Sequence, residues 1–333
     1  MPSISDKSFW FWTDPAARQP LSGLCEVLVP SDLQMCRALL APPPRDELMT
    51  RSGPDSNCVA VEAHYSSREL GAAILAALGE AGVDCDHLKP EDLAPIDEFH
   101  IGGRKATLEL ARQLDLDETL QVLDVGSGLG GPSRCLAMEF GCRVTGIDLC
   151  AEYCRTATML AERLGLDSRV SYRHGNALDM PFADGSFDVV WTQHAAMNIA
   201  DKDRLYAEMW RVLKPGGRLA VYDVLAGEGG PIRFPVPWAR TPDISCLISP
   251  QQLRDRLENL GFEILSWQDS TEKGRSWFRR MGAKISQEGL PPLGIHLLLG
   301  AEFRLMAQNQ VRNLEEDRIA LVETIVKRPS SPE

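Results

Sequence analysis

The sequence predicts an α/β fold built around a parallel β-sheet. Between about residues 120 and 270, short apolar runs alternate with longer segments in which apolar residues recur every three or four positions. Such runs are typical of buried strands, and the longer segments are typical of amphipathic helices. Strand–helix–strand units of this length form parallel sheets with right-handed crossovers. We therefore predict a doubly wound, Rossmann-like sheet with its ligand site at the carboxyl ends of the strands.

The composition is that of a globular, water-soluble protein. The chain has 333 residues, of which 44% are hydrophobic and 25% charged, and its formal net charge is −12. An acidic surface repels phosphodiester backbones, so we expect no nucleic-acid partner. We find no apolar run near the roughly 20 residues of a membrane span, and no signal-peptide pattern. Nine cysteines without a Cys-x-x-Cys pair favour reduced thiols, a cytoplasmic location and no metal site.

The first 60 residues differ from the rest of the chain. Residues 1–60 show no sustained period but contain the aromatic cluster Phe9–Trp12. Because an exposed aromatic cluster is costly, we expect this arm to dock on the body or on a partner chain. From Tyr65 onward, apolar residues at helical spacing predict a helix. Residues 61–103 are therefore predicted to form a helical cap, followed by the main domain over residues 104–333.

Six segments of the main domain are predicted strands. They are Leu120–Val125, Arg143–Ile147, Val170–Arg173, Phe187–Trp191, Leu219–Val224 and Phe262–Trp267. Two of the intervening helices have clear start signals, because Asp201 is a candidate N-cap and Ser249 precedes Pro250 at the first helical position. Residues Leu213–Arg218 are expected to form a turn into the fifth of these strands.

The first predicted strand leads into a glycine-rich bend. Gly126 and Gly128 let the backbone turn tightly and approach a ligand, and the next helix offers free N–H groups. Asp148 ends the second strand, where a carboxylate can accept hydrogen bonds from both hydroxyls of a ribose. Alone, these features also fit a dinucleotide site or a bend that merely joins a strand to a helix. Asp124 favours another ligand, because its carboxylate would repel a pyrophosphate and attract a cationic amino group.

Five motifs, taken in order, resemble those of the class I S-adenosylmethionine-dependent methyltransferases. They are Asp124–Gly131, Gly146–Leu149, Asn176–Phe182, Phe187–Val190 and Val212–Gly217. The resemblance covers about residues 97–268. Phe99–Gly103, together with Gly128–Pro132, is similar to the small-molecule branch that includes sarcosine/dimethylglycine and tocopherol methyltransferases. The resemblance implies a seven-stranded sheet whose last strand is antiparallel, and Arg318–Lys327 is our candidate for that strand.

The resemblance also implies S-adenosylmethionine as the cofactor. It assigns the binding of this cofactor to Asp124, Gly126, Ser127, Gly128, Asp148, Leu149, Asn176, Ala177 and Gln193. Asp124 would support the amino group, and Asp148 would hold the ribose hydroxyls. Leu149 would pack on the adenine, which Asn176 would read. Gln193 would lie beside the sulfonium.

Three residues are candidates for catalysis on the acceptor side. Methyl transfer from a sulfonium is an in-line displacement with a good leaving group, so the protein mainly supplies alignment and a dry site. His194 follows the fourth strand and is suited to act as a base near neutral pH, or else it is a capping or core histidine. For His100, positioning fits better than proton transfer. Tyr65 would lie over the acceptor; alternatively, it is a half-buried aromatic residue with a structural role.

The segment at about residues 226–248 is expected to form an acceptor lid. Arg233 and Arg240 could bind a carboxylate, and Trp238 could stack on a cationic amine, although a surface loop explains these residues equally well. Asn198 lies where some related amine methyltransferases carry a histidine, and an amide cannot act as a base. We therefore place Asn198 with these three residues as a candidate acceptor-binding residue.

We predict methyl transfer to a small-molecule acceptor, in the first place an amine nitrogen, with oxygen, carbon and sulfur acceptors open. A homodimer is possible. The alternatives are an NAD-dependent oxidoreductase and a cofactor-binding protein without catalysis.

Overall fold

The structure is a computed structural model that describes residues 56–65 and 69–330. The side chains of Ser56, Asn57 and Tyr65 are outside this description. Most of the predicted arm, including Phe9–Trp12, also lies outside the described residues. All described residues belong to one compact unit.

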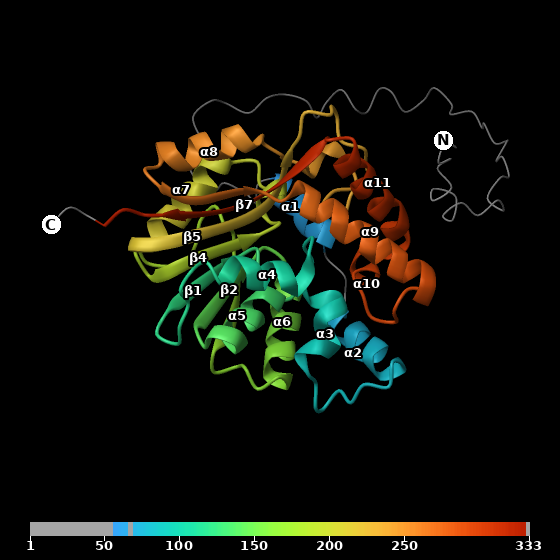
Figure 1. Cartoon of the computed structure of the whole chain (residues 1–333). Helices are drawn as coiled ribbons and strands as arrows, with labels where there is room; N and C mark the ends of the chain where they lie inside the picture. Colours follow the sequence, from blue (N-terminus) through green and yellow to red (C-terminus); the bar gives the residue numbers. More distant parts are fainter. Residues whose placement is uncertain (1–55, 66–68, 331–333) are drawn as a thin grey trace, which may run out of the picture. The chain divides into compact units, whose positions relative to one another are not determined.

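Seven strands form one mixed sheet (Figure 1). They are β1 (Gln121–Val125), β2 (Arg143–Asp148), β3 (Val170–His174), β4 (Phe187–Gln193), β5 (Leu213–Ala226), β6 (Glu263–Asp269) and β7 (Ile319–Lys327). Their order in the sheet is β3-β2-β1-β4-β5-β7-β6, and β7 runs antiparallel to both of its neighbours. The predicted seven-stranded fold with an antiparallel last strand is thus confirmed. Strand order reverses between β1 and β4, which is where doubly wound sheets bind ligands.

One predicted turn is wrong. Leu213–Arg218 belongs to β5, which begins at Leu213 opposite Phe187 and shifts its register before Val189. The left-handed backbone of Gly216, with a φ of 82°, accommodates this irregularity. Residues 214–217 therefore bulge out between Leu213 and Arg218, which both pair with β4.

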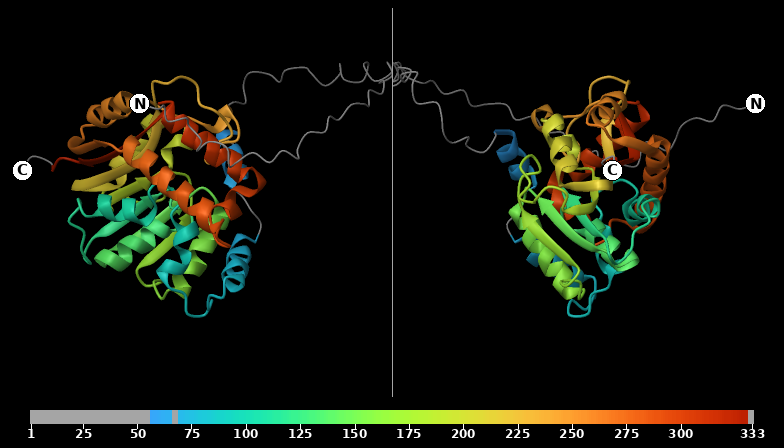
Figure 2. Two further views of the ribbon diagram at one scale, coloured as in Figure 1. Left: turned by 45° about the vertical axis from the view of Figure 1, so that its right-hand side comes forward. Right: turned by 90° about the vertical axis from the view of Figure 1, so that its left-hand side faces the viewer.

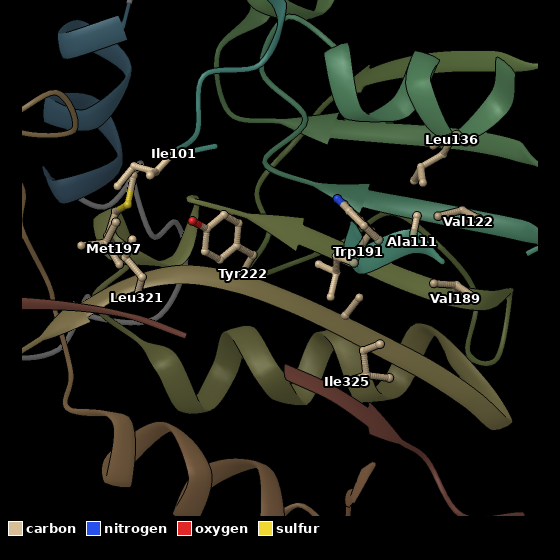
Figure 3. Packing of buried hydrophobic residues seen from close by; sticks show 14 of the residues in the cluster. Ile101, Ala111, Val122, Leu136, Val189, Trp191, Met197, Tyr222, Leu321 and Ile325 are labelled. Carbon is tan, nitrogen blue, oxygen red and sulfur yellow. The ribbon is translucent and has the colours of Figure 1, made fainter. Parts of the chain in front are cut away.

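Helices cover both faces of the sheet (Figure 1). The helices after the cap are α4 (Gly103–Ala111), α5 (Gly131–Phe140), α6 (Ala151–Arg163), α7 (Lys202–Val212), α8 (Pro250–Asn259), α9 (Thr271–Glu288), α10 (His296–Leu299) and α11 (Phe303–Glu315), of which α10 packs on other helices. Side chains of α4 and α5 pack with Trp191 and Tyr222 on one face (Figure 3), whereas α7 and α8 pack on the other. Both predicted N-caps are confirmed, because Asp201 and Ser249 each accept a backbone N–H of the following helix.

The cap consists of α1 (Ser56–Tyr65), α2 (Leu70–Glu80) and α3 (Pro90–Asp97). The helix predicted from Tyr65 onward is present as α2, but its predicted start is wrong, since Tyr65 ends α1 and α2 begins after Glu69. The backbone of Glu69 is left-handed, with a φ of 66°, and this conformation separates α2 from the preceding chain.

The helices that follow β6 lie beside the antiparallel part of the sheet. Helix α9 contacts β7 and α11, and both views of Figure 2 show these orange and red helices against the sheet. Within the part of the chain that the structure describes, no helix combines the length and apolarity needed to cross a bilayer.

Candidate functional site

A cavity lies at the carboxyl ends of β1, β2 and β4, at the strand-order reversal. Most of the residues singled out from the sequence line it: His100, Gly126, Ser127, Gly128, Asp148, Leu149, Asn176, Ala177, Gln193, His194 and Asn198. Four others do not: Asp124, Arg233, Trp238 and Arg240. The site is thus assembled by the strand ends, as a parallel sheet predicts.

The glycine-rich bend folds over the end of β2. The N–H groups of Gly126 and Ser127 donate to the carbonyl of Ile147, at 2.8 and 3.2 Å. Gly126 has a φ of 76°, and a Cβ there would lie 2.3 Å from the Cβ of Ala195. Only glycine therefore allows the bend to approach the loop after β4 so closely.

Asp148 is held rigidly at the rim of the bend. Its Oδ2 accepts the Gly128 N–H and its Oδ1 accepts the Cys150 N–H, both at 2.8 Å. Burial raises the pKa of Asp148, and these two hydrogen bonds oppose the rise. Each carboxylate oxygen keeps a lone pair for a further donor. The geometry therefore suits recognition of a diol.

Asp124 occupies a different place from the one predicted. Its side chain is buried behind the bend, where Oδ2 accepts a 2.6 Å hydrogen bond from Ser133 Oγ at the start of α5. Burial raises the pKa of Asp124 to about 7, opposed by the Ser133 hydrogen bond. Asp124 is therefore not among the residues that line the cavity, and its predicted support of an amino group stays a prediction.

Three buried polar atoms around the cavity lack a hydrogen-bond partner among the described residues. They are Ser127 Oγ, Gln193 Nε2 and His194 Nε2. An unpaired buried polar group costs roughly 1–3 kcal/mol, so such a cluster is typical of a site that a polar ligand completes. The bend, the fixed carboxylate and these three atoms fit a nucleoside that carries an amino-acid group.

His194 stands at the turn out of β4. Its backbone is left-handed, with a φ of 50°, and its N–H donates to the Tyr222 carbonyl at 2.8 Å. The ring lies 4.8 Å from the Tyr222 ring and 6.0 Å from the His100 ring, measured between centroids. Burial, with a smaller effect of His100, lowers the pKa of His194 well below 6.5. At neutral pH the ring is uncharged and can accept a proton.

His100 belongs to a buried polar cluster that the sequence analysis did not identify. His100 Nε2 lies 2.6 Å from Glu98 Oε2, and Thr107 Oγ1 donates to the same oxygen at 2.7 Å. Burial would raise the pKa of Glu98, but the hydrogen bonds from His100 and Thr107 outweigh it and hold that pKa below its usual range. Glu98 stands two residues before His100, which was the available signal. The cluster agrees with a positioning role for His100.

The predicted stacking role of Trp238 is wrong. Its side chain is 1% exposed, and its indole N–H donates to Ser245 Oγ at 3.0 Å. The Asn198 amide donates to the carbonyls of Trp238 and Ile244, at 2.7 and 2.8 Å. Asn198 therefore ties the loop after β4 to the segment after β5, and its amide protons are engaged within the protein.

The predicted anion-binding role of the two lid arginines also fails. Arg233 pairs with Glu316 at 2.9 Å, and Arg240 pairs with Glu302 at 2.7 Å, on partly exposed surface outside the cavity lining. Both guanidinium groups thus link the lid to the C-terminal helices.

Helix α1 lines the cavity through Cys58, Val61 and Glu62. The His64 ring at the end of this helix lies 3.1 Å from the Pro237 carbonyl of the segment after β5. The sequence of α1 has no clear apolar stripe, which is why these residues escaped prediction. The side chain of Tyr65 is outside the described residues, so its catalytic role stays a prediction.

Part of the chain is similar in sequence to known methyltransferases. Residues 123–221 match a family model described as a methyltransferase domain. The chain is 37% identical over 134 residues to the methyltransferase GfsG of Streptomyces halstedii, covering 40% of this chain and 48% of the relative. It is 30% identical over 164 residues to a sarcosine/dimethylglycine N-methyltransferase of Halorhodospira halochloris, covering 49% and 58%. The matched part thus spans about half of these relatives.

The fold also matches solved structures. The cyclase SpnF superposes with a TM-score of 0.61 at 23% sequence identity, over 83% of this chain and 98% of that chain. At this identity the likeness establishes the fold alone. The match of residues 123–221 to this family model confirms the predicted resemblance for that part of the chain.

Proposed function

We propose that this protein binds S-adenosylmethionine and transfers its methyl group to a small-molecule acceptor. The observation that carries the proposal is the cavity at the strand-order reversal of a methyltransferase domain, where Asp148 and three unpaired polar atoms surround a glycine-rich bend. The bound cofactor would supply an electrophilic methyl group on a sulfonium.

The charges around the cavity support a cationic cofactor over a dinucleotide. The carboxylates of Glu62, Asp148 and Asp201 line it, whereas that of Asp97, which also lines it, is paired with the buried Arg134. A pyrophosphate placed among these groups would be repelled, whereas a sulfonium and an ammonium group would be attracted. This arrangement counts against the NAD-dependent alternative.

The residues at the strand ends would divide the cofactor among them. Asp148 would accept the two ribose hydroxyls, and Leu149 would pack on the adenine beside Asn176 and Ala177. The Asn176 Oδ1 already accepts the Leu178 N–H at 2.9 Å, so its side-chain orientation is fixed. The bend would contact the amino-acid part.

His194 is our candidate for the catalytic base. Its uncharged ring can take a proton from an acceptor such as an amine or a hydroxyl as the nucleophile attacks in line. The left-handed backbone at this position is a strained conformation of the kind found at active sites. An amine nitrogen remains our first expectation for the accepting atom, with His100 and Tyr65 as positioning residues.

Ligand binding tests this proposal before any acceptor is known. Isothermal titration calorimetry with S-adenosylhomocysteine, and thermal shift with S-adenosylmethionine and NAD, should show binding of the two sulfur nucleosides only. Stabilisation by NAD alone would refute the proposal. A screen of radiolabelled methyl transfer to amines, amino acids, phenols and thioethers then identifies the acceptor class.

A further inference from the structure

The side-chain oxygen of Gln193 lies close to two polar neighbours, Trp191 and Thr107. Trp191 Nε1 lies 3.0 Å from Gln193 Oε1, and Thr107 Oγ1 lies 3.3 Å from the same oxygen. Gln193 is 7% exposed and lines the cavity, while Trp191 is fully buried.

The indole of Trp191 determines which way the amide points. An indole N–H can only donate, so it requires the amide oxygen opposite it. The reverse orientation would place two donors 3.0 Å apart in a buried site. The Thr107 hydroxyl adds little, because its single proton is directed to Glu98, which is closer at 2.7 Å.

The amide nitrogen is left as an unused donor by this arrangement. Gln193 Nε2 is buried and has no hydrogen-bond partner in the described part of the chain. Ser127 Oγ and His194 Nε2, also unpartnered, belong to the same cavity lining. A donor fixed in this place calls for an acceptor atom on a ligand.

We propose that Trp191 is a positioning residue that locks Gln193 as a hydrogen-bond donor to an oxygen atom of the bound ligand. The proposal deepens the proposed function and rests on it for the identity of the ligand. Two oxygens have the required chemistry: the carboxylate of the cofactor's amino-acid part and an oxygen of the methyl acceptor.

The strand and the core make this lock rigid. Trp191 and Gln193 are two residues apart on β4, so their side chains lie on the same face of the sheet. Figure 3 shows Trp191 packed among apolar side chains that include Ala111 and Val122. Its N–H therefore has little freedom to leave Gln193.

A double-mutant cycle tests whether the Trp191–Gln193 hydrogen bond acts on ligand binding. Trp191→Phe keeps an aromatic ring but removes the donor, and Gln193→Ala removes the amide. For S-adenosylhomocysteine we expect each single variant to weaken the Kd by about 3- to 10-fold. The double variant should bind no more weakly than Gln193→Ala alone. Trp210→Phe, on α7 and packed on Phe262, is the matched control and should bind normally.

A second ligand distinguishes a partner oxygen on the cofactor's carboxylate from one on the methyl acceptor. 5′-Methylthioadenosine lacks the amino-acid part, so a carboxylate partner predicts that neither variant changes its Kd. If the partner is the acceptor oxygen, S-adenosylhomocysteine binding is unchanged, and the non-additive loss appears in the KM of the acceptor. Additive losses for every ligand would overturn the proposal.

A spectroscopic measurement keeps the orientation testable in the ligand-free protein. The Trp191 indole N–H proton resonance should move upfield in Gln193→Ala, because its acceptor is lost. An unchanged Trp191 resonance would overturn the assigned orientation of the Gln193 amide. If the resonance moves upfield but neither sulfur nucleoside binds, only the proposed function is refuted.

Discussion

Replacing Asp148 by asparagine tests the centre of the binding site. Both carboxylate oxygens already accept backbone N–H groups, those of Gly128 and Cys150, at 2.8 Å. A ribose diol would add one donor to each oxygen. Asparagine keeps one oxygen and turns an NH2 group toward a backbone N–H and a ligand hydroxyl. The loss of one hydrogen bond to a charged group is worth about 1.5–3 kcal/mol, or roughly 10- to 150-fold in Kd.

Calorimetry with S-adenosylhomocysteine measures this change directly. Asp167→Asn, which removes an exposed carboxylate outside the cavity, controls for the change in net charge and should leave the Kd unaltered. Circular dichroism verifies that the Asp148→Asn variant is folded. A folded variant that binds as tightly as the parent would refute the assignment of Asp148 to the ribose.

Three further predictions concern the walls of the site. His194→Gln should lower kcat by about 100-fold or more, while the Kd of S-adenosylhomocysteine stays constant. Because the pKa of His194 lies well below 6.5, the kcat of the parent protein should begin to fall only below pH 6.5. A midpoint of this fall above pH 6.5 would contradict the base role. The pKa of Asp124 is raised by burial to about 7, so the folded protein retains a proton that the unfolded chain loses above about pH 4, and stability should fall as pH rises through this window. In urea titrations between pH 4 and 7, the free energy of unfolding of Asp124→Asn should therefore rise relative to that of the parent by up to about 1.4 kcal/mol per pH unit. A difference in unfolding free energy that does not change with pH would count against the raised pKa. Gly126→Ala should lower the melting temperature and the ligand affinity much more than Gly128→Ala does. The added methyl group would lie 2.3 Å from Ala195 at position 126, but would enter open space at position 128. Equal effects of the two substitutions would show that the close approach to Ala195 is unimportant.

The parts of the fold that depend on local sequence were predictable. Apolar runs located all six strands of the alternating pattern, and the glycines with Asp148 located the bend. The last strand came from the family resemblance. These signals are local because strand burial, helix capping and left-handed turns constrain the residues that carry them.

The errors concern side chains whose partners depend on how neighbouring elements pack, even where those partners are close in the sequence. Asp124 faces Ser133 instead of the cavity, and Trp238 is buried against Ser245. Nothing in either neighbourhood of the sequence says which element packs on it. The sequence places Trp191 and Gln193 on the same face of a strand, because they are two residues apart. Their hydrogen bond, however, depends on side-chain rotamers that only the packed core fixes.

The position of β7 has a consequence for how the protein is made. β7 lies between β5 and β6, and β6 pairs with no other strand of the described residues. During synthesis from the N-terminus, β6 therefore leaves the ribosome before its neighbour exists, and the outer edge of β5 stays open until residues 319–327 follow. Contacts between segments so far apart in sequence form slowly. The nascent chain thus carries two open strand edges for that interval, and these edges are the places where a chaperone would protect it from pairing with other chains.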